Sequence, residues 1–185
     1  MDICIFPGTF NPIHRAHLSM AEFILKNYNF DKIIFVPSYI PPHKELDKSM
    51  AEHRFNMVKL AISGNKKFGI SDVEYKSNGT SYSLITVQKI KNEYSVKGRL
   101  NFIIGTDAFL NVKSWYKADE LKELVHFLVF PRGDDSIINE EFDGYSYELV
   151  DAPKSDISST ELRNEHYELT TNKVKDYIKK YELYN

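Results

Sequence analysis

The chain has 185 residues, of which 42% are hydrophobic and 14% aromatic, enough for a packed core and incompatible with a disordered chain. Its formal net charge of -2 excludes the broad basic face of a nucleic-acid binder. The sequence shows neither a signal peptide nor an apolar run long enough to cross a bilayer. We therefore expect a cytoplasmic protein with no nucleic-acid or membrane partner. Cys4 is the single cysteine, so no intrachain disulfide or multi-cysteine metal site can form.

Short β-rich runs alternate with helix-length amphipathic stretches, a pattern that predicts an α/β fold with an open parallel sheet covered by helices on both faces. In chain order we expect a strand at 3–6, a helix at 16–27, a strand at 32–36, a helix at 51–63, a strand at 68–73, a helix at 82–94, a strand at 100–104, a helix at 119–124, strands at 126–130 and 147–150, and helices at 159–165 and 172–181. No linker divides the chain, so residues 1–185 are expected to form a single domain, with a small helical part from about 158 to 185 packed on it.

The segment between the first expected strand and the first expected helix is the strongest candidate for a ligand site. Open α/β sheets bind ligands at loops that leave the carboxyl ends of parallel strands. Gly8 lets the backbone approach a ligand closely, and the helix start offers N–H groups to phosphate. His14 and His17 are three residues apart and can donate to the same phosphoryl oxygens. A helix cap or a surface pair fits these two histidines as well, whereas metal ligation lacks a third ligand at a telling spacing.

A second polar cluster lies near the other end of the chain. Ser158, Ser159 and Thr160 are good N-cap residues for a short helix, whose remaining N–H groups can bind a polyphosphate. Arg163 lies about one turn into that helix and can reach the same anion with its forked donors. An ordinary capped helix with a surface arginine fits these residues equally well.

Both segments resemble the signatures of one superfamily, the HIGH-motif nucleotidyltransferases. The early signature, G-[ST]-F-[DN]-P-x-H-x-[GA]-H, is matched by Gly8-Thr9-Phe10-Asn11-Pro12-Ile13-His14-Arg15-Ala16-His17, and the late one, I-S-S-T-x-[IL]-R, by Ile157-Ser158-Ser159-Thr160-Glu161-Leu162-Arg163. The resemblance implies a Rossmann-like sheet and the use of ATP. It further implies ATP-binding residues at Gly8, Thr9, Phe10, His14, His17, Gly105, Asp107, Ile157, Ser158, Ser159 and Arg163.

Other segments, spread over nearly the whole chain, resemble the bacterial nicotinate-nucleotide adenylyltransferases in particular. These segments are Pro41-Pro42-His43-Lys44, the helix with Arg54, Met57 and Ala61, Ser71-Asp72-Val73-Glu74, Thr80-Ser81-Tyr82-Ser83, Gly105-Thr106-Asp107 with Trp115, and Pro131-Arg132-Gly133. The resemblance implies that nicotinate mononucleotide binds at Lys44, Thr80, Ser81, Tyr82, Ser83 and Trp115.

The implied residue types suit a flat ring that bears a carboxylate. Trp115 and Tyr82 can stack on the ring, and hydroxyls and N–H groups of residues 80–83 can hold the carboxylate. Trp115 also fits a partly buried core aromatic. Asp107 can accept hydrogen bonds from ribose hydroxyls, or can instead cap the helix expected to begin near Ala108.

The resemblance implies that the mononucleotide phosphate attacks the α-phosphorus of ATP. The expected catalytic residues are His14, His17, Lys44 and Arg163, with Mg²⁺ arriving on ATP and no metal ligand from the protein. Nicotinamide mononucleotide and phosphopantetheine stay open as alternative acceptors, as do a non-catalytic nucleotide sensor on the same fold and a homo-oligomeric state. A nicotinamide-dependent oxidoreductase fits less well, because no G-x-G-x-x-G follows the first strand.

Overall fold

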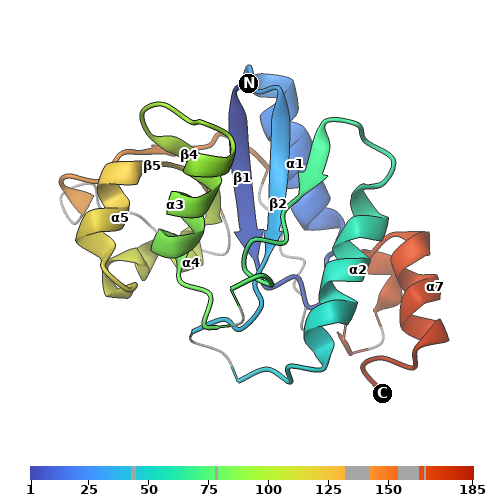
Figure 1. The fold of residues 1–185 in the computed structure, drawn as a ribbon. Coiled ribbons are helices and arrows are strands. Elements are labelled where there is room, and N and C mark those ends of the chain that lie inside the picture. Colours follow the sequence, from blue (N-terminus) through green and yellow to red (C-terminus); the bar gives the residue numbers. More distant parts are fainter. Residues whose placement is uncertain (43–44, 78, 132–141, 154–162, 165) are drawn as a thin grey trace.

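The computed structural model describes residues 1–42, 45–77, 79–131, 142–153, 163–164 and 166–185. Its centre is a sheet of parallel strands (Figure 1), in the order β3-β2-β1-β4-β5-β6. The strands are β1 Ile3–Gly8, β2 Lys32–Pro37, β3 Phe68–Ile70, β4 Leu100–Gly105, β5 Val125–Phe130 and β6 Tyr147–Leu149. The sheet and its parallel pairing confirm the fold class predicted from the alternation of β-rich and helical stretches.

Helices cover both faces of this sheet. One face packs against α1 Arg15–Asn27, α2 Met50–Ile62 and α7 Asn172–Lys180, and the other against α3 Ser83–Glu93, α4 Thr106–Leu110 and α5 Ala118–Leu124. In Figure 1, α7 lies beside α2, which confirms the expected helical part at the C-terminus. Within the part of the chain that the structure describes, no helix combines the length and the apolar character needed to span a bilayer.

The strands divide their side chains between the two cores in strict alternation. Along β1, Cys4 and Phe6 belong to the core under α1, α2 and α7, whereas Ile3 and Ile5 belong to the core under α3, α4 and α5. Side chains of a strand point alternately to opposite faces, so a strand that is apolar at every position requires cover on both sides. The Cys4 side chain is fully buried in the first of these cores, at 0% exposed.

The expected helices and strands coincide with the observed ones to within a residue or two, except at β3. That strand ends at Ile70, so the prediction of strand through residue 73 is wrong. The Ser71 hydroxyl accepts a hydrogen bond from the Val73 N–H at 3.3 Å, and a turn follows in which the Tyr75 N–H donates to the Asp72 carbonyl at 3.0 Å. Such local bonds compete with the ladder of a sheet. The helix expected at 159–165 falls mostly outside the described residues.

The order of the strands places a crevice at the carboxyl ends of β1 and β4, in the middle of the sheet. From β1 the chain moves outward to β2 and β3, and it then returns to add β4 on the opposite side of β1. The loops that follow β1 and β4 therefore leave the sheet in opposite directions at the carboxyl ends of two neighbouring strands. Open α/β sheets bind their ligands at such a switch point.

Candidate functional site

A cavity of about 960 Å³ lies at this switch point and brings together residues from both ends of the sequence. The predicted site residues that line it are Gly8, Thr9, Phe10, His14, His17, Ser81, Tyr82, Ser83, Gly105, Asp107, Trp115 and Arg163. Thr80 is exposed and forms an isolated bridge with Ile40, next to this lining. Lys44, Ile157, Ser158 and Ser159 lie outside the described residues.

The two histidines stand at the start of α1. His14 is the N-cap residue, in an extended conformation, and its backbone N–H donates to Nδ1 of His17 at 3.1 Å. The two imidazole rings are stacked, with their centroids 3.7 Å apart. Because Nδ1 of His17 accepts a hydrogen bond, the proton of its neutral ring sits on Nε2. The interpretation as a helix cap is thus confirmed, and the same ring also lines the cavity.

Phe10 supports the His17 ring from behind. Its side chain is only 2% exposed and meets the His17 ring edge to face, at 5.0 Å between centroids. The Phe10 backbone has φ of 49°, which is unusual for a residue with a side chain. A Cβ on Gly8 would lie 2.8 Å from Cζ of Phe10, so the absence of a side chain at Gly8 makes room for this ring. In the structure Gly8 permits a close approach within the protein, and its contact with ATP stays a prediction.

Arg54, in the middle of α2, ties the loops after β1 and β2 together. Its guanidinium is fully buried and donates to the carbonyls of Thr9 at 2.8 Å, Ser38 at 2.6 Å and Tyr39 at 2.9 Å. Burial lowers the pKa of Arg54. The sequence alone assigns this residue no role, although its spacing of three and four from the buried Met57 and Val58 places it on the core side of α2.

Ser81 joins the loop after β2 to the start of α3. Its hydroxyl oxygen accepts hydrogen bonds from the backbone N–H groups of Tyr39, at 2.9 Å, and Ile40, at 3.2 Å. The same hydroxyl donates a hydrogen bond to the Glu74 carboxylate. A hydroxyl has one donor and two acceptor positions, so this one is saturated inside the protein. Any contact between the 80–83 segment and a ligand carboxylate therefore falls to groups other than the Ser81 hydroxyl.

Glu74 is the buried acceptor of this network. It is 7% exposed and accepts from the Thr86 hydroxyl at 2.7 Å and from the Tyr39 N–H at 3.2 Å. Burial raises the pKa of Glu74, while its hydrogen bonds and the nearby positive charge of Arg54 act in the opposite direction. The network joins the loop after β2 to the start of α3 at the cavity. The spacing of these residues along the sequence does not predict this network.

Three aromatic side chains, those of Tyr82, Trp115 and Tyr116, also line the cavity. Trp115 is half-buried beside Phe102, with 6.2 Å between ring centroids, which confirms its interpretation as a partly buried core aromatic. Tyr82 stacks on Tyr116 at 4.5 Å, and the Tyr116 ring is 45% exposed. Tyr116 was not among the predicted residues, and its position directly after Trp115 is the one signal in the sequence that could have found it. These rings give the cavity a flat apolar surface.

Arg163 and Asp107 both line the cavity. Nη1 of Arg163 donates to the carbonyl of Asn11 at 2.5 Å, so the late arginine lies against the early loop. Asp107 is exposed in the first turn of α4, and the N-cap of that helix is Gly105. The interpretation of Asp107 as the helix cap is therefore wrong, because α4 begins two residues earlier than expected.

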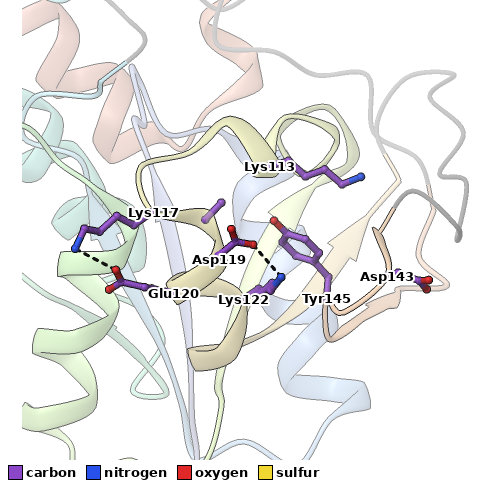
Figure 2. A pocket seen from close by; sticks show the side chains of 8 residues that line it. Lys113, Lys117, Asp119, Glu120, Lys122, Asp143 and Tyr145 are labelled. Atoms are coloured by element: carbon purple, nitrogen blue, oxygen red, sulfur yellow. Dashed lines mark hydrogen bonds and ion pairs between the residues drawn. The ribbon is translucent and has the colours of Figure 1, made fainter.

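A second hollow, of about 580 Å³, lies outside α5 (Figure 2) and contains none of the predicted residues. Its charged groups pair with one another, as Lys117 with Glu120 at 3.0 Å and Lys122 with Asp119 at 2.9 Å. In neither hollow do the described residues bring three His, Cys, Asp or Glu side chains close enough to hold a metal ion. The cavity at the switch point is the candidate active site.

Comparisons with known proteins agree in pointing to one group. The cytidylyltransferase-like family model matches residues 5–165. The chain is 37% identical to the nicotinate-nucleotide adenylyltransferase of Bacillus subtilis, over 98% of this chain and 97% of the relative, and 36% identical to a probable nicotinate-nucleotide adenylyltransferase of Caldicellulosiruptor saccharolyticus, over 100% and 99%. The solved structure of the Plasmodium falciparum nicotinic acid mononucleotide adenylyltransferase complexed with NaAD is similar, with a TM-score of 0.82 and 26% identity over 99% of this chain and 97% of that one.

Proposed function

We propose that this chain, which belongs to the nicotinate-nucleotide adenylyltransferase family, transfers the adenylyl group of ATP to nicotinate mononucleotide, giving nicotinate adenine dinucleotide and pyrophosphate. The observation that carries the proposal is the meeting of His14, His17 and Arg163 in one cavity that aromatic rings also line. Side chains that can donate hydrogen bonds to phosphate, together with flat apolar rings, suit a substrate pair made of a polyphosphate and a pyridine nucleotide.

The reaction requires no nucleophile from the protein. An oxygen of the mononucleotide 5′-phosphate attacks the α-phosphorus of ATP, a new P–O bond forms, and the bond to the β-phosphate breaks as pyrophosphate leaves with the electron pair. Catalysis then consists of positioning and of stabilising the charge on the phosphoryl oxygens. The Nε2–H of His17, fixed by the bond to Nδ1, is suited to donate to the α-phosphate, with His14 stacked beside it.

The leaving pyrophosphate is assigned to the late motif. Arg163 lines the cavity beside Asn11 and brings a permanent positive charge to it. From the sequence, Ser159 is proposed to hold the pyrophosphate together with Arg163, and Lys44 is proposed to act as a clamp that reaches over from its own loop. Magnesium enters as part of the substrate, MgATP, because Mg²⁺ usually keeps several waters and binds through phosphates. Both substrates are charged metabolites, so we place the reaction in the cytoplasm.

The start of α3 favours the acid over the amide of the pyridine ring. The first bond of this helix joins the Thr86 N–H to the Tyr82 carbonyl, so the N–H groups of Ser83 and Leu84 have no partner in the preceding turn of the helix. These N–H groups, together with the positive end of the helix dipole, attract a negative group. They directly follow Tyr82, the N-cap residue of α3, whose ring stacks on Tyr116, and a nicotinate bound at these rings would present its carboxylate to the start of the helix.

The test offers the purified protein MgATP with nicotinate mononucleotide, nicotinamide mononucleotide or phosphopantetheine in parallel and measures pyrophosphate and the adenylylated product. We expect nicotinate mononucleotide to give the highest kcat/KM. A preference for nicotinamide mononucleotide would refute the role of the α3 N-terminus, and a preference for phosphopantetheine would refute the aromatic ring site. Tight nucleotide binding without release of pyrophosphate would show a nucleotide sensor instead of an enzyme.

A further inference from the structure

The C-terminal segment of the chain is anchored on the loop that carries the histidines. The Thr170 hydroxyl, which is fully buried, donates to the carbonyl of Ile13 at 2.8 Å. Nε of Arg15 donates to the carbonyl of Glu168 at 3.2 Å. These two contacts fix residues on either side of His14, so the backbone that presents the imidazoles is held from the far end of the sequence.

A tight turn after α7 sends the last residues back into the protein. Glu182 has φ of 51°, its N–H donates to the Lys179 carbonyl at 3.3 Å, and the Leu183 N–H donates to the Ile178 carbonyl at 3.0 Å. This pair of bonds is the Schellman arrangement, in which apolar residues on either side of the turn also pack together. Leu183 and Ile178 are 7% and 2% exposed and belong to the same core. The turn therefore fixes the direction in which Tyr184 leaves the helix.

Tyr184 reaches Asn11, which lies in the loop that lines the cavity. Its hydroxyl donates to Oδ1 of Asn11 at 2.6 Å, while the main-chain carbonyl of the same asparagine accepts from Arg163 at 2.5 Å. Burial raises the pKa of Tyr184, although the charges of Arg163 and Arg54 act against this, so the phenol stays protonated and remains a donor at neutral pH. Asn11 is thus held through both of its carbonyl oxygens, by the two side chains that the C-terminal region supplies.

We propose that Tyr184 is a positioning residue for adenylyl transfer, acting through Asn11 on the placement of Arg163 and of the loop that leads to His14 and His17. The inference rests on the proposed function. Tyr184 itself touches no reacting atom, and its effect passes through a single side-chain hydrogen bond. Tyr184 then helps to position the catalytic groups although it follows every motif of the sequence.

The hydrogen bond predicts a particular kinetic signature. Misplacement of a catalytic group by about 1 Å can cost up to about a hundred-fold in rate, so loss of this one support is expected to lower kcat by about ten-fold. The KM for nicotinate mononucleotide should change less than about two-fold, because its ring site is built by α3 and by the segment after α4. A purely structural role would not separate kcat from KM in this way.

The experiment compares Tyr184→Phe with Tyr181→Phe in steady-state kinetics, with thermal unfolding followed for both. Tyr181 is a matched control: it lies in the same segment, it is 45% exposed, and no hydrogen bond from its hydroxyl occurs among the described residues. We expect the ten-fold loss of kcat for Tyr184→Phe alone. Wild-type kcat in Tyr184→Phe, or an equal loss in Tyr181→Phe, would overturn the inference, whereas an inactive wild-type protein would instead refute the proposed function.

Variants of the acceptor keep the test decisive if Tyr184→Phe unfolds. Asn11→Ala removes the acceptor without altering the C-terminal segment and should reproduce the loss of kcat, whereas Asn11→Asp keeps an acceptor oxygen and should stay near wild type. In the Asn11→Ala background, Tyr184→Phe should cost nothing further. A second ten-fold loss in that double variant would show that Tyr184 acts by another route, and normal kcat in Asn11→Ala alone would also overturn the inference.

Discussion

Replacing the buried Arg54 tests the idea that one guanidinium fixes the loops on both sides of the cavity. Arg54→Met keeps most of the side-chain volume and removes the donors to three carbonyls, those of Thr9, Ser38 and Tyr39. A hydrogen bond from a charged donor contributes roughly 1.5–3 kcal/mol, but removal also relieves the cost of several kcal/mol for burying the charge. We therefore expect a net loss of about 3 kcal/mol in the free energy of unfolding.

For a chain of this size, 3 kcal/mol corresponds to a decrease in Tm of roughly 6–12 °C, measured by circular dichroism. Urea unfolding at 25 °C should give the matching free energy. Arg99→Met is the control: its ion pair with Glu123, at 3.5 Å, is largely exposed and worth less than about 1 kcal/mol. Equal Tm values for Arg54→Met and Arg99→Met would refute the reasoning. Because Thr9 borders the histidine loop, kcat of Arg54→Met should fall as well, even at temperatures where the variant is folded.

His17→Ala should lower kcat by roughly a hundred- to a thousand-fold through the loss of one transition-state donor, with Tm nearly unchanged; near-normal turnover would remove His17 from the mechanism. Trp115→Ala should raise the KM for nicotinate mononucleotide by roughly ten-fold or more, since ring stacking is worth about 1–3 kcal/mol, and a change confined to the KM for ATP would show that Trp115 does not bind the pyridine. Burial raises the pKa of Glu74 above its ordinary value of 4.5, so the folded protein binds this proton more tightly than the unfolded chain does. The wild type should therefore lose stability relative to Glu74→Gln as the pH rises above 4.5. Urea unfolding of both proteins from pH 4 to 8 measures this difference, and a relative gain for wild type with rising pH would contradict the assignment.

The elements of the fold were predictable because each carries a local signal. Strands that are apolar at every position indicate a parallel sheet covered on both faces, and the carboxyl-end rule places the ligand site at the loop after the first of them. Two motifs far apart in the sequence could be assigned to the same site only through their resemblance to a family. The structure shows the corresponding contact directly, in the bond from Arg163 to Asn11.

The supports of the site could not be predicted, because they depend on backbone positions far apart in sequence. The three acceptors of Arg54 become neighbours only after β1, β2 and α2 have packed, and the reach of Tyr184 depends on a left-handed conformation at Glu182, which is not a glycine. The Ser81 hydroxyl illustrates the same limit. Its residue type suggests a ligand contact, whereas its three hydrogen bonds all stay within the protein.

A crystal structure of the protein with bound nicotinate adenine dinucleotide would show whether the histidines and Arg163 hold the phosphates of a dinucleotide in one cavity. The proposed mechanism places the diphosphate of this product in the cavity at the switch point, with a phosphate oxygen about 3 Å from Nε2 of His17, a typical donor-to-acceptor distance. The guanidinium of Arg163 should face the vacant pyrophosphate position, and the pyridine should lie against Trp115 and the stacked rings of Tyr82 and Tyr116. A dinucleotide whose pyridine occupies the histidine end, or which binds outside α5, would contradict it.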